Sequence, residues 1–309
     1  MPRRLQFSLR TLLVALTIIA VWLGIEINAV RRKREAVDAV LAAGGTVYYD
    51  YQINATTGFS REAEPNAPRW LRKLLGDIYF GNVVDVDLNR TKISDEWLAC
   101  LNDLPAIEQL NLAYTPISDA GIVSLNHLRN LRSAYLGETR VTNKSVEYLV
   151  SHCPDLRTLD LSGPGITDAA LEPISRLRQL RTLVITQARI TDAGLASLRN
   201  LDELEMLWLA SMPIGDGALE PIIELPKLQR LFLLDLNITD AGAAQVARLD
   251  TLQRLAITQA PVTDAGVASF AELRWLKRLE LFDTQVSDEG LRRLTAALPM
   301  CKVSTSPPP

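Results

Sequence analysis

Residues 180–204 read LRTLVITQARITDAGLASLRNLDEL and contain one complete unit of the pattern from which the fold is predicted. Within residues 180–190 the aliphatic residues follow the spacing L-x-x-L-x-I-x-x-A-x-I. The alternation in this spacing is typical of a strand that buries one face. Thr191-Asp192-Ala193-Gly194 comes next, and its hydroxyl and acidic side chain favour the start of a helix. Leucines at every third position then follow, which predicts a short, tightly wound helix.

The same unit recurs at a period of about 24 residues. Each copy is anchored by one aliphatic residue, followed in most units by a Ser/Thr-Asp pair, at Ile93, Ile117, Val141, Ile166, Ile190, Ile214, Ile238, Val262 and Val286. Neighbouring anchors are 24 residues apart, except for one step of 25 whose extra residue falls in 151–154. This repeat predicts a solenoid, because one such unit cannot bury its own apolar face and must stack on its neighbours.

The units resemble the leucine-rich repeat, whose pattern L-x-x-L-x-L-x-x-N/C-x-L supplies one strand and one helix or 3₁₀ turn. The resemblance covers residues 83–303 and implies an α/β solenoid, with a curved parallel sheet inside and short helices outside. The sequence departs from the pattern at the asparagine position, which holds Thr91, Thr115, Thr139, Pro164, Ala188, Met212, Leu236, Ala260 and Thr284. We therefore expect most of the family's asparagine ladder to be absent, with threonine supplying part of its hydrogen bonding.

The predicted sheet has nine or ten strands and, at about 4.8 Å between strands, a length on the order of 40 to 45 Å. Leu183 and Leu255 are expected in its core. Capping material is predicted at both ends, because a terminal unit would otherwise expose apolar surface.

Two columns of side chains are predicted on the concave face, because strand residues alternate between the two faces of a sheet. One column is Asp87, Asn111, Tyr135, Asp160, Val184, Trp208, Phe232, Ala256 and Glu280. The column before it is Asp85, Gln109, Ser133, Thr158, Thr182, Met206, Arg230, Arg254 and Arg278. Together they predict a surface that is acidic at the first unit, apolar and aromatic in the middle, and basic along the arginines.

Adjacent Trp and Arg residues are the types that most often dominate the binding energy of protein interfaces. An exposed cluster of large apolar residues is also unusual for a surface that meets only solvent. The sequence therefore predicts a partner-binding patch at Tyr135, Met206, Trp208, Arg230, Phe232, Leu234 and Arg254. The alternative is a cross-strand ladder that stabilises the sheet and binds nothing, with the arginines offset by local carboxylates such as Asp235, Glu280 and Asp283.

The composition excludes several classes of protein. With 33 Lys and Arg against 36 Asp and Glu in 309 residues, there is no global basic field to hold nucleic acid. The two histidines, His127 and His152, and the three cysteines are too few and too scattered for a zinc site. We expect the histidines at the surface or in loops, and the cysteines in the core rather than as reactive thiols, at Cys100, Cys153 and Cys301.

Common motifs of catalytic and cofactor-binding sites are missing from the sequence. It contains no G-x-x-x-x-G-K-S/T, G-x-G-x-x-G, H-E-x-x-H or G-x-S-x-G string. The recurring aspartates lie at helix starts one repeat apart, so capping explains them better than a row of calcium sites. We expect no cofactor, no metal ion and no enzymatic activity; an unrecognised site within residues 44–82 is the only place left for the enzyme alternative.

A membrane-directed segment is predicted at the amino terminus. Residues 12–25, LLVALTIIAVWLGI, carry no charge and are followed by RRKR at 31–34. Residues 7–27 give 21 positions, enough for one span with Arg10 and Glu26 near its ends. We expect an uncleaved single-pass anchor, since no A-x-A-like cleavage site follows; a cleaved signal peptide and a buried soluble helix are the alternatives. Basic residues on both sides leave the orientation undecided.

The predicted organisation has four parts: a membrane anchor with basic flanks at 1–34, an α/β cap at 35–82, a solenoid of about nine units at 83–303 and a disordered Pro-rich tail at 304–309. Within the cap, helices are expected at 35–43 and 68–75 and a strand at 46–52. The segment FSLRTLL at 7–13, with the Ile-Thr-Asp-Ala-Gly repeats, also resembles the membrane-anchored leucine-rich repeat proteins of planctomycete bacteria. That narrower resemblance implies no particular activity.

These observations predict a membrane-tethered, non-enzymatic scaffold that binds a protein or peptide partner on its concave face, with no nucleic acid and no small-molecule substrate. A structural component of the cell envelope, which acts through lateral assembly, is the first alternative. The second is the substrate-recognition subunit of a larger complex, which rests on analogy with other leucine-rich repeats.

Overall fold

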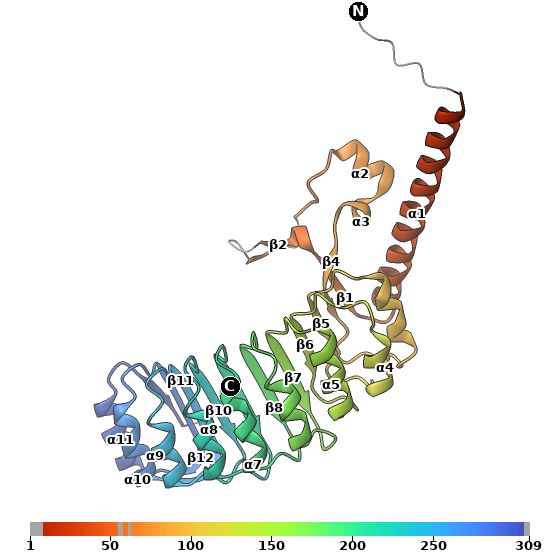
Figure 1. The fold of residues 1–309 in the computed structure, drawn as a ribbon. Coiled ribbons are helices and arrows are strands. Elements are labelled where there is room, and N and C mark those ends of the chain that lie inside the picture. Colours follow the sequence, from red (N-terminus) through yellow and green to blue (C-terminus); the bar gives the residue numbers. More distant parts are fainter. Residues whose placement is uncertain (1–8, 55–57, 61–62, 306–309) are drawn as a thin grey trace, which may run out of the picture.

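A long helix leads into a curved solenoid (Figure 1). The computed structural model describes residues 9–54, 58–60 and 63–305. The solenoid strands, one per repeat, run parallel in chain order: β4 (Val83–Asp87), β5 (Gln109–Asn111), β6 (Ser133–Leu136), β7 (Thr158–Ser162), β8 (Thr182–Thr186), β9 (Met206–Ala210), β10 (Arg230–Leu234), β11 (Arg254–Thr263), β12 (Arg278–Gln285) and β13 (Lys302–Ser304). The predicted curved parallel sheet is therefore confirmed.

The connections between strands hold short helices that line the convex side. They alternate between α-helix and 3₁₀ helix, as leucines at every third position predict. Their bounds are η2 (Trp97–Asp103), α4 (Asp119–Ser124), α5 (Asn143–His152), η3 (Asp168–Ala170), α6 (Leu171–Ile174), α7 (Asp192–Leu195), η4 (Ala196–Asn200), η5 (Asp216–Ala218), α8 (Leu219–Ile222), α9 (Asp240–Val246), α10 (Asp264–Ala268), η6 (Ser269–Glu272) and α11 (Asp288–Ala297).

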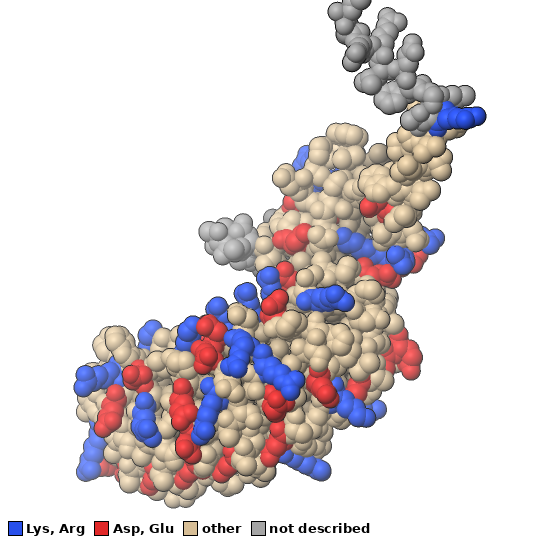
Figure 2. Space-filling view, in the orientation of Figure 1, with Lys and Arg blue, Asp and Glu red and all other residues tan. Residues whose placement is uncertain are grey.

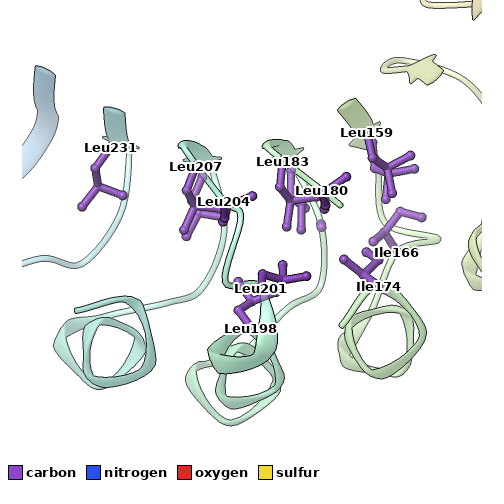
Figure 3. Packing of buried hydrophobic residues seen from close by; sticks show 14 of the residues in the cluster. Leu159, Ile166, Ile174, Leu180, Leu183, Leu198, Leu201, Leu204, Leu207 and Leu231 are labelled. Atoms are coloured by element: carbon purple, nitrogen blue, oxygen red, sulfur yellow. The ribbon is translucent and has the colours of Figure 1, made fainter. Parts of the chain in front are cut away.

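The core lies between the sheet and the helices and runs through all the units. Figure 3 shows Leu183, Leu207 and Leu231 of three neighbouring strands pointing toward the helical layer, from which Leu198 and Leu201 point back. All five side chains are fully buried. Leucine is placed where the sequence pattern requires it, so each unit buries its apolar face against the units before and after it.

Both ends of the solenoid are covered. At the start, β1 (Thr46–Tyr49) pairs antiparallel with β4, and Ala36, Val37 and Val40 of the preceding helix are buried in the core. At the end, β13 pairs with β12, and Cys301 is buried beneath it. The 3₁₀ turn η1 (Asp50–Gln52) replaces the last part of the strand that was predicted at 46–52.

The helix predicted at 35–43 is the end of a much longer element, α1 (Leu9–Ala42). No proline interrupts residues 9–42, and strong helix formers fill the basic stretch after the apolar segment, so the helix continues unbroken. The rest of the cap comprises β2 (Ile53–Asn54), β3 (Gly58–Phe59), α2 (Arg69–Leu75) and α3 (Asp77–Phe80). Residues 1–8 of the predicted anchor and 306–309 of the predicted tail lie outside the described residues.

Threonine replaces the asparagine ladder with bonds inside its own unit. The hydroxyls of Thr91 and Thr115 donate to the carbonyls of Leu88 and Leu112, each at 2.6 Å. Thr139 makes the same bond in the third unit, at 2.7 Å. The expectation that threonine supplies part of the hydrogen bonding is confirmed for these units.

Aspartate side chains add hydrogen bonds between neighbouring units, and these bonds were not predicted from the sequence. Asp216 accepts hydrogen bonds from the backbone amide of Thr239 at 2.8 Å and from its hydroxyl at 2.6 Å. The same pair of bonds joins Asp95 to Ser118, Asp119 to Thr142, Asp168 to Thr191, Asp240 to Thr263 and Asp264 to Ser287. The two residues of each pair lie 23 positions apart. Each aspartate is thus the first residue of the helix in its own unit, and its carboxylate binds the residue that precedes the helix of the next unit.

Two joints of this aspartate ladder differ from the others. Asn143 takes the aspartate position in the third unit, where it accepts from the amide of Thr167 at 3.0 Å and donates to the hydroxyl at 2.7 Å. Asp192 meets Gly215, which has no hydroxyl, so one bond of 2.8 Å from the glycine amide is all that remains there.

Each solenoid unit from β4 to β12 has one residue in the left-handed conformation, which follows the strand in β4 to β10 and lies within the longer strands β11 and β12. Eight of these residues are not glycine and have φ between 50° and 61°: Arg90, Tyr114, Glu138, Gln187, Ser211, Asp235, Gln259 and Asp283. Gly163, with φ of 100°, takes the corresponding position in the fourth unit. This turn costs free energy in every unit that lacks glycine there.

Charged side chains of both signs alternate along the flank of the solenoid (Figure 2). Several pair across one repeat, among them Arg132 with Glu108 at 2.9 Å and Arg181 with Glu205 at 3.1 Å. These pairs are exposed, so each adds little to stability.

Candidate functional site

The concave face carries both predicted columns in the expected register. Met206 lies beside Arg230, which lies beside Arg254 and then Arg278. In the second column Trp208 lies beside Phe232, followed by Ala256 and Glu280. The strand alternation read from the sequence thus places each side chain correctly.

Side chains of four neighbouring strands form a continuous row on this face. The Trp208 and Phe232 rings stack with their centroids 4.7 Å apart and an angle of 20° between their planes. The Arg254 guanidinium lies 4.9 Å from the Phe232 ring centroid. Arg254 also pairs with Glu280 at 2.8 Å, and Arg278 pairs with the same carboxylate oxygen at 2.5 Å.

This row corrects the expectation that Phe232 is part of the exposed patch. Phe232 is only 4% exposed and Glu280 only 7%. Ala256 lies between them in the register and is covered as well. Because Ala256 is small, the Arg254 side chain passes over it and contacts both neighbours. Phe232 is therefore in contact with the Trp208 ring from one neighbouring strand and with Arg254 from the other, and alternation cannot predict such contacts.

The accessible part of the patch is made by its remaining members. Met206, Trp208, Leu234 and Arg254 are half-buried. Arg230 is exposed and makes no ion pair or hydrogen bond through its side chain with any described residue. The result is an apolar surface on the sheet, with the Arg230 guanidinium, unpaired within the described residues, next to it.

Tyr135 is separated from the other predicted site residues. It lies on β6, between Asn111 and Asp160, toward the acidic end of the concave face. Burial raises the pKa of Tyr135, and the Asp85 carboxylate adds to that rise. The structure therefore brings six of the seven predicted residues together and leaves Tyr135 in acidic surroundings.

Two carboxylates at that end of the face hold their protons unusually strongly. Burial raises the pKa of Asp85 to about 6, with a further contribution from Asp87. One oxygen of Asp85 is buried without a hydrogen-bond partner, while Gln109 donates to the other at 3.0 Å. Burial also raises the pKa of Asp160 to about 6, together with the nearby Glu138 carboxylate.

The cysteines and histidines offer no reactive centre. Burial raises the pKa of Cys100 and Cys153 to about 11 and also raises that of Cys301, which disfavours the nucleophilic thiolate. Cys153 and Cys301 are core residues as predicted, and Cys100 is half-buried. His127 and His152 are exposed. Among the residues that the structure describes, no cluster of three His, Cys, Asp or Glu side chains could hold a metal ion.

An exposed tryptophan that was not predicted from the sequence lies at the edge where the strands begin. Trp275 is 69% exposed and borders an open pocket of about 600 Å³. Lys227, Gln229, Gln253 and Lys277 line the same pocket. The signal was present in the sequence, because Trp275 occupies a variable position of the leucine pattern where no core residue is needed.

One described helix is long and apolar enough to cross a membrane, judged by length and composition. It is α1, within which Leu12–Ala42 is the candidate segment. The apolar side chains of residues 12–25 are not covered by the rest of the chain.

Comparison with known sequences supports the leucine-rich repeat family. The family described as Leucine Rich repeat matches residues 152–175 and 272–294. No curated protein sequence matches the chain.

Solved structures with a similar solenoid include bacterial and plant proteins. Internalin C2 of Listeria monocytogenes is 25% identical, with a TM-score of 0.47, and the match covers 67% of this chain and 84% of that one. A leucine-rich repeat protein of Leptospira interrogans is 20% identical, with a TM-score of 0.48 and coverage of 71% and 59%. The Arabidopsis receptor kinase HAESA, solved with a peptide hormone and a co-receptor, is 19% identical, with a TM-score of 0.47 and coverage of 66% and 39%.

Proposed function

We propose that this leucine-rich repeat solenoid is a membrane-tethered, non-enzymatic interaction module whose concave face binds a protein or peptide. The observation that carries the proposal is the exposed Arg230, which forms no ion pair with any residue the structure describes and lies next to the half-buried Met206 and Trp208. Such a site suits a partner that offers an apolar or aromatic side chain and a carboxylate close to it.

Rigidity supports binding at this patch. Trp208 is held by its stack on Phe232, and Phe232 is covered by Arg254, which is fixed by Glu280. A surface that is already ordered loses little conformational entropy when a partner binds, so a modest contact area suffices. The buried residues of the row thus act as supports for the accessible ones.

The tether in this proposal is an uncleaved single-pass anchor at residues 7–27. Its support is the continuity of α1, which runs from the apolar segment to Val40 without a break. Ala36, Val37 and Val40 at its end are buried in the first unit of the solenoid. The helix therefore joins the apolar segment directly to the folded part of the chain. The resemblance of residues 7–13 to the anchored proteins of planctomycetes agrees with this arrangement.

Arg230→Glu combined with Met206→Ala tests the concave patch. Arg230 is exposed and Met206 half-buried, and neither belongs to the stack that covers Phe232, so this variant changes the patch while Phe232 stays covered. We expect the amount of a partner cross-linked in native membranes to fall by about tenfold or more, because loss of one dominant interface residue weakens binding by that factor. Arg189→Glu is the matched control, since Arg189 is also exposed and makes no ion pair in the described part of the chain. A set of cross-linked partners that stays the same in the double variant would rule out this patch.

The structural component of the cell envelope is the alternative that one observation favours. Trp208, Phe232, Arg254 and Glu280 satisfy one another within the sheet, as a ladder that serves only stability would. This alternative expects concentration-dependent self-association of the full chain in analytical ultracentrifugation, and no loss of partners in the double variant. A substrate-recognition subunit would instead co-purify with a catalytic chain.

A further inference from the structure

The short helix α2 exposes large apolar side chains that its own chain does not cover. Trp70 is 68% exposed and Leu74 72%, and Leu75 beside them is also exposed. The seven residues of α2 include no buried residue. A helix this short is not stable by itself in water. Packing within the chain does not explain its outward apolar side chains, and such an exposed apolar patch is typical of a binding or membrane-contact surface.

The helix α2 lies next to the part of α1 that follows the apolar segment. Ile27, Val30 and Arg34 of α1 line an open cleft of about 560 Å³ together with Lys73 and Leu74 of α2. In Figure 1, α2 lies beside α1 on the side of α3 that faces away from the sheet. The helix α2 is therefore at the same end of the solenoid as the apolar segment.

Ion pairs fix the orientation of α2. Arg72, whose side chain is 12% exposed, donates to both carboxylate oxygens of Asp77, at 2.6 Å and 3.0 Å, and to Glu64 at 2.6 Å. These bonds raise the pKa of Arg72 and lower the pKa of Glu64 and of Asp77. Because Arg72 faces the protein and is held on both sides, Trp70 and Leu74 are turned outward.

Three basic side chains that form no ion pair within the described part of the chain lie next to this apolar face. Arg69 and Lys73 flank it, and Arg34 reaches it from α1. None of the three makes an ion pair with a described residue. Two more arginines lie nearby in α1, Arg31 and Arg32, with carboxylates at 3.7 Å and 3.6 Å. Tryptophan, leucine and unpaired basic residues on one face are the combination that a bilayer surface with anionic lipids attracts.

We infer that α2 inserts Trp70 and Leu74 into the headgroup region of the bilayer that α1 crosses, while Arg69 and Lys73 contact the phosphates of anionic lipids. This inference rests on the proposed membrane span of α1. The helix α2 is then a second contact with the membrane, and it fixes the tilt of the solenoid above the lipid surface.

Fluorescence quenching by brominated lipids tests the inference on the full chain. The protein is reconstituted in vesicles of phosphatidylcholine and phosphatidylserine whose acyl chains carry bromine near the headgroup. Trp70→Phe is compared with Trp275→Phe, because Trp275 is equally exposed at 69% but belongs to the last units of the solenoid. With Trp22 and Trp70 as the two membrane-facing tryptophans out of five, Trp70→Phe removes about half of the quenched emission and Trp275→Phe removes none.

Trp22→Phe separates failure of the inference from failure of the span. If Trp22→Phe lowers the quenched emission and Trp70→Phe does not, the apolar segment of α1 is inserted in the bilayer and the inference about α2 is overturned. If Trp22→Phe has no effect, the proposed span itself is wrong. Arg69→Gln with Lys73→Gln tests the charge. We expect this double variant to show less quenching of Trp70 than the wild type in the same vesicles. We also expect the wild type to show less quenching of Trp70 in vesicles of phosphatidylcholine alone. Equal quenching in both lipids overturns the role of anionic headgroups, and cross-linking of α2 to a second copy overturns lipid as its occupant.

Discussion

The carboxylate of Asp168 accepts hydrogen bonds from both the backbone amide and the hydroxyl of Thr191, at 2.8 Å and 2.7 Å. An added Cβ on Gly194 would lie 2.2 Å from the same carboxylate. Because the glycine of the Thr-Asp-Ala-Gly motif has no side chain, it leaves room for the aspartate carboxylate of the preceding unit.

Gly194→Ala displaces the Asp168 side chain and breaks its bonds to Thr191. We expect Gly194→Ala and Asp168→Ala each to lower the free energy of unfolding by about 1 to 2 kcal/mol. The double variant costs less than the sum, because Asp168→Ala removes the two atoms closest to the new methyl group. Urea denaturation of the four proteins measures the coupling, and strictly additive losses would contradict it.

Gly163→Ala isolates the cost of the left-handed turn. Gly163 has φ of 100° and no atom within 4 Å of an added Cβ, so the substitution introduces strain without a clash. We expect a loss of about 1 kcal/mol in the free energy of unfolding. Gln187→Gly, at the corresponding turn of the next unit, should change stability in the opposite direction by a smaller amount, since glycine also loses more entropy on folding. Thermal melts of both variants check the two signs.

Leu183→Ala and Val184→Ala compare the two faces of β8. Leu183 is fully buried, whereas Val184 is half-buried on the concave face. We expect the leucine variant to lose about 2 to 5 kcal/mol in denaturant melts and the valine variant less than about 1 kcal/mol. Similar losses in both variants would mean that the strand register is wrong.

Asp85 and Asp160 make stability depend on pH in a defined window. Their folded-state pKa is about 6, above the ordinary value of 3.8. The folded protein therefore keeps protons that the unfolded chain has already lost, so their contribution is complete below the ordinary pKa and is lost as the pH rises through about 6. Asp119 acts in the opposite direction: burial pushes its pKa up, but bonds from Ser145 and Thr142 outweigh this and hold it low, so its stabilisation is lost in acid.

Asp85→Asn with Asp160→Asn removes the first of these effects. We expect the double variant to be more stable than the wild type at about pH 7, and to lose the downward slope of stability between about pH 4 and pH 6. Denaturant melts across this range measure it. A slope that persists in the double variant would assign it to other groups.

The strand positions were predictable because leucine spacing is a local property of each unit, as Leu180, Leu183 and Ile185 show. The bonds from Asp168 to Thr191 were not predicted, since they join residues 23 positions apart, although the joint recurrence of Asp and Gly in the motif was a signal. The burial of Phe232 depends on Arg254 from the next strand. A pattern assigns a residue to a face of the sheet, but it does not show which long side chain covers it.

The joint between Asp192 and Gly215 has one hydrogen bond where most of the others have two. In a linear array each unit is held by its neighbours alone, so thermal opening of the array starts at its weakest seam. That seam separates the unit of β8 from the unit of β9. Met206, Trp208, Arg230, Phe232, Leu234 and Arg254 all lie on the same side of it. When the units separate at this joint, the residues of the concave patch therefore stay together on one side of it.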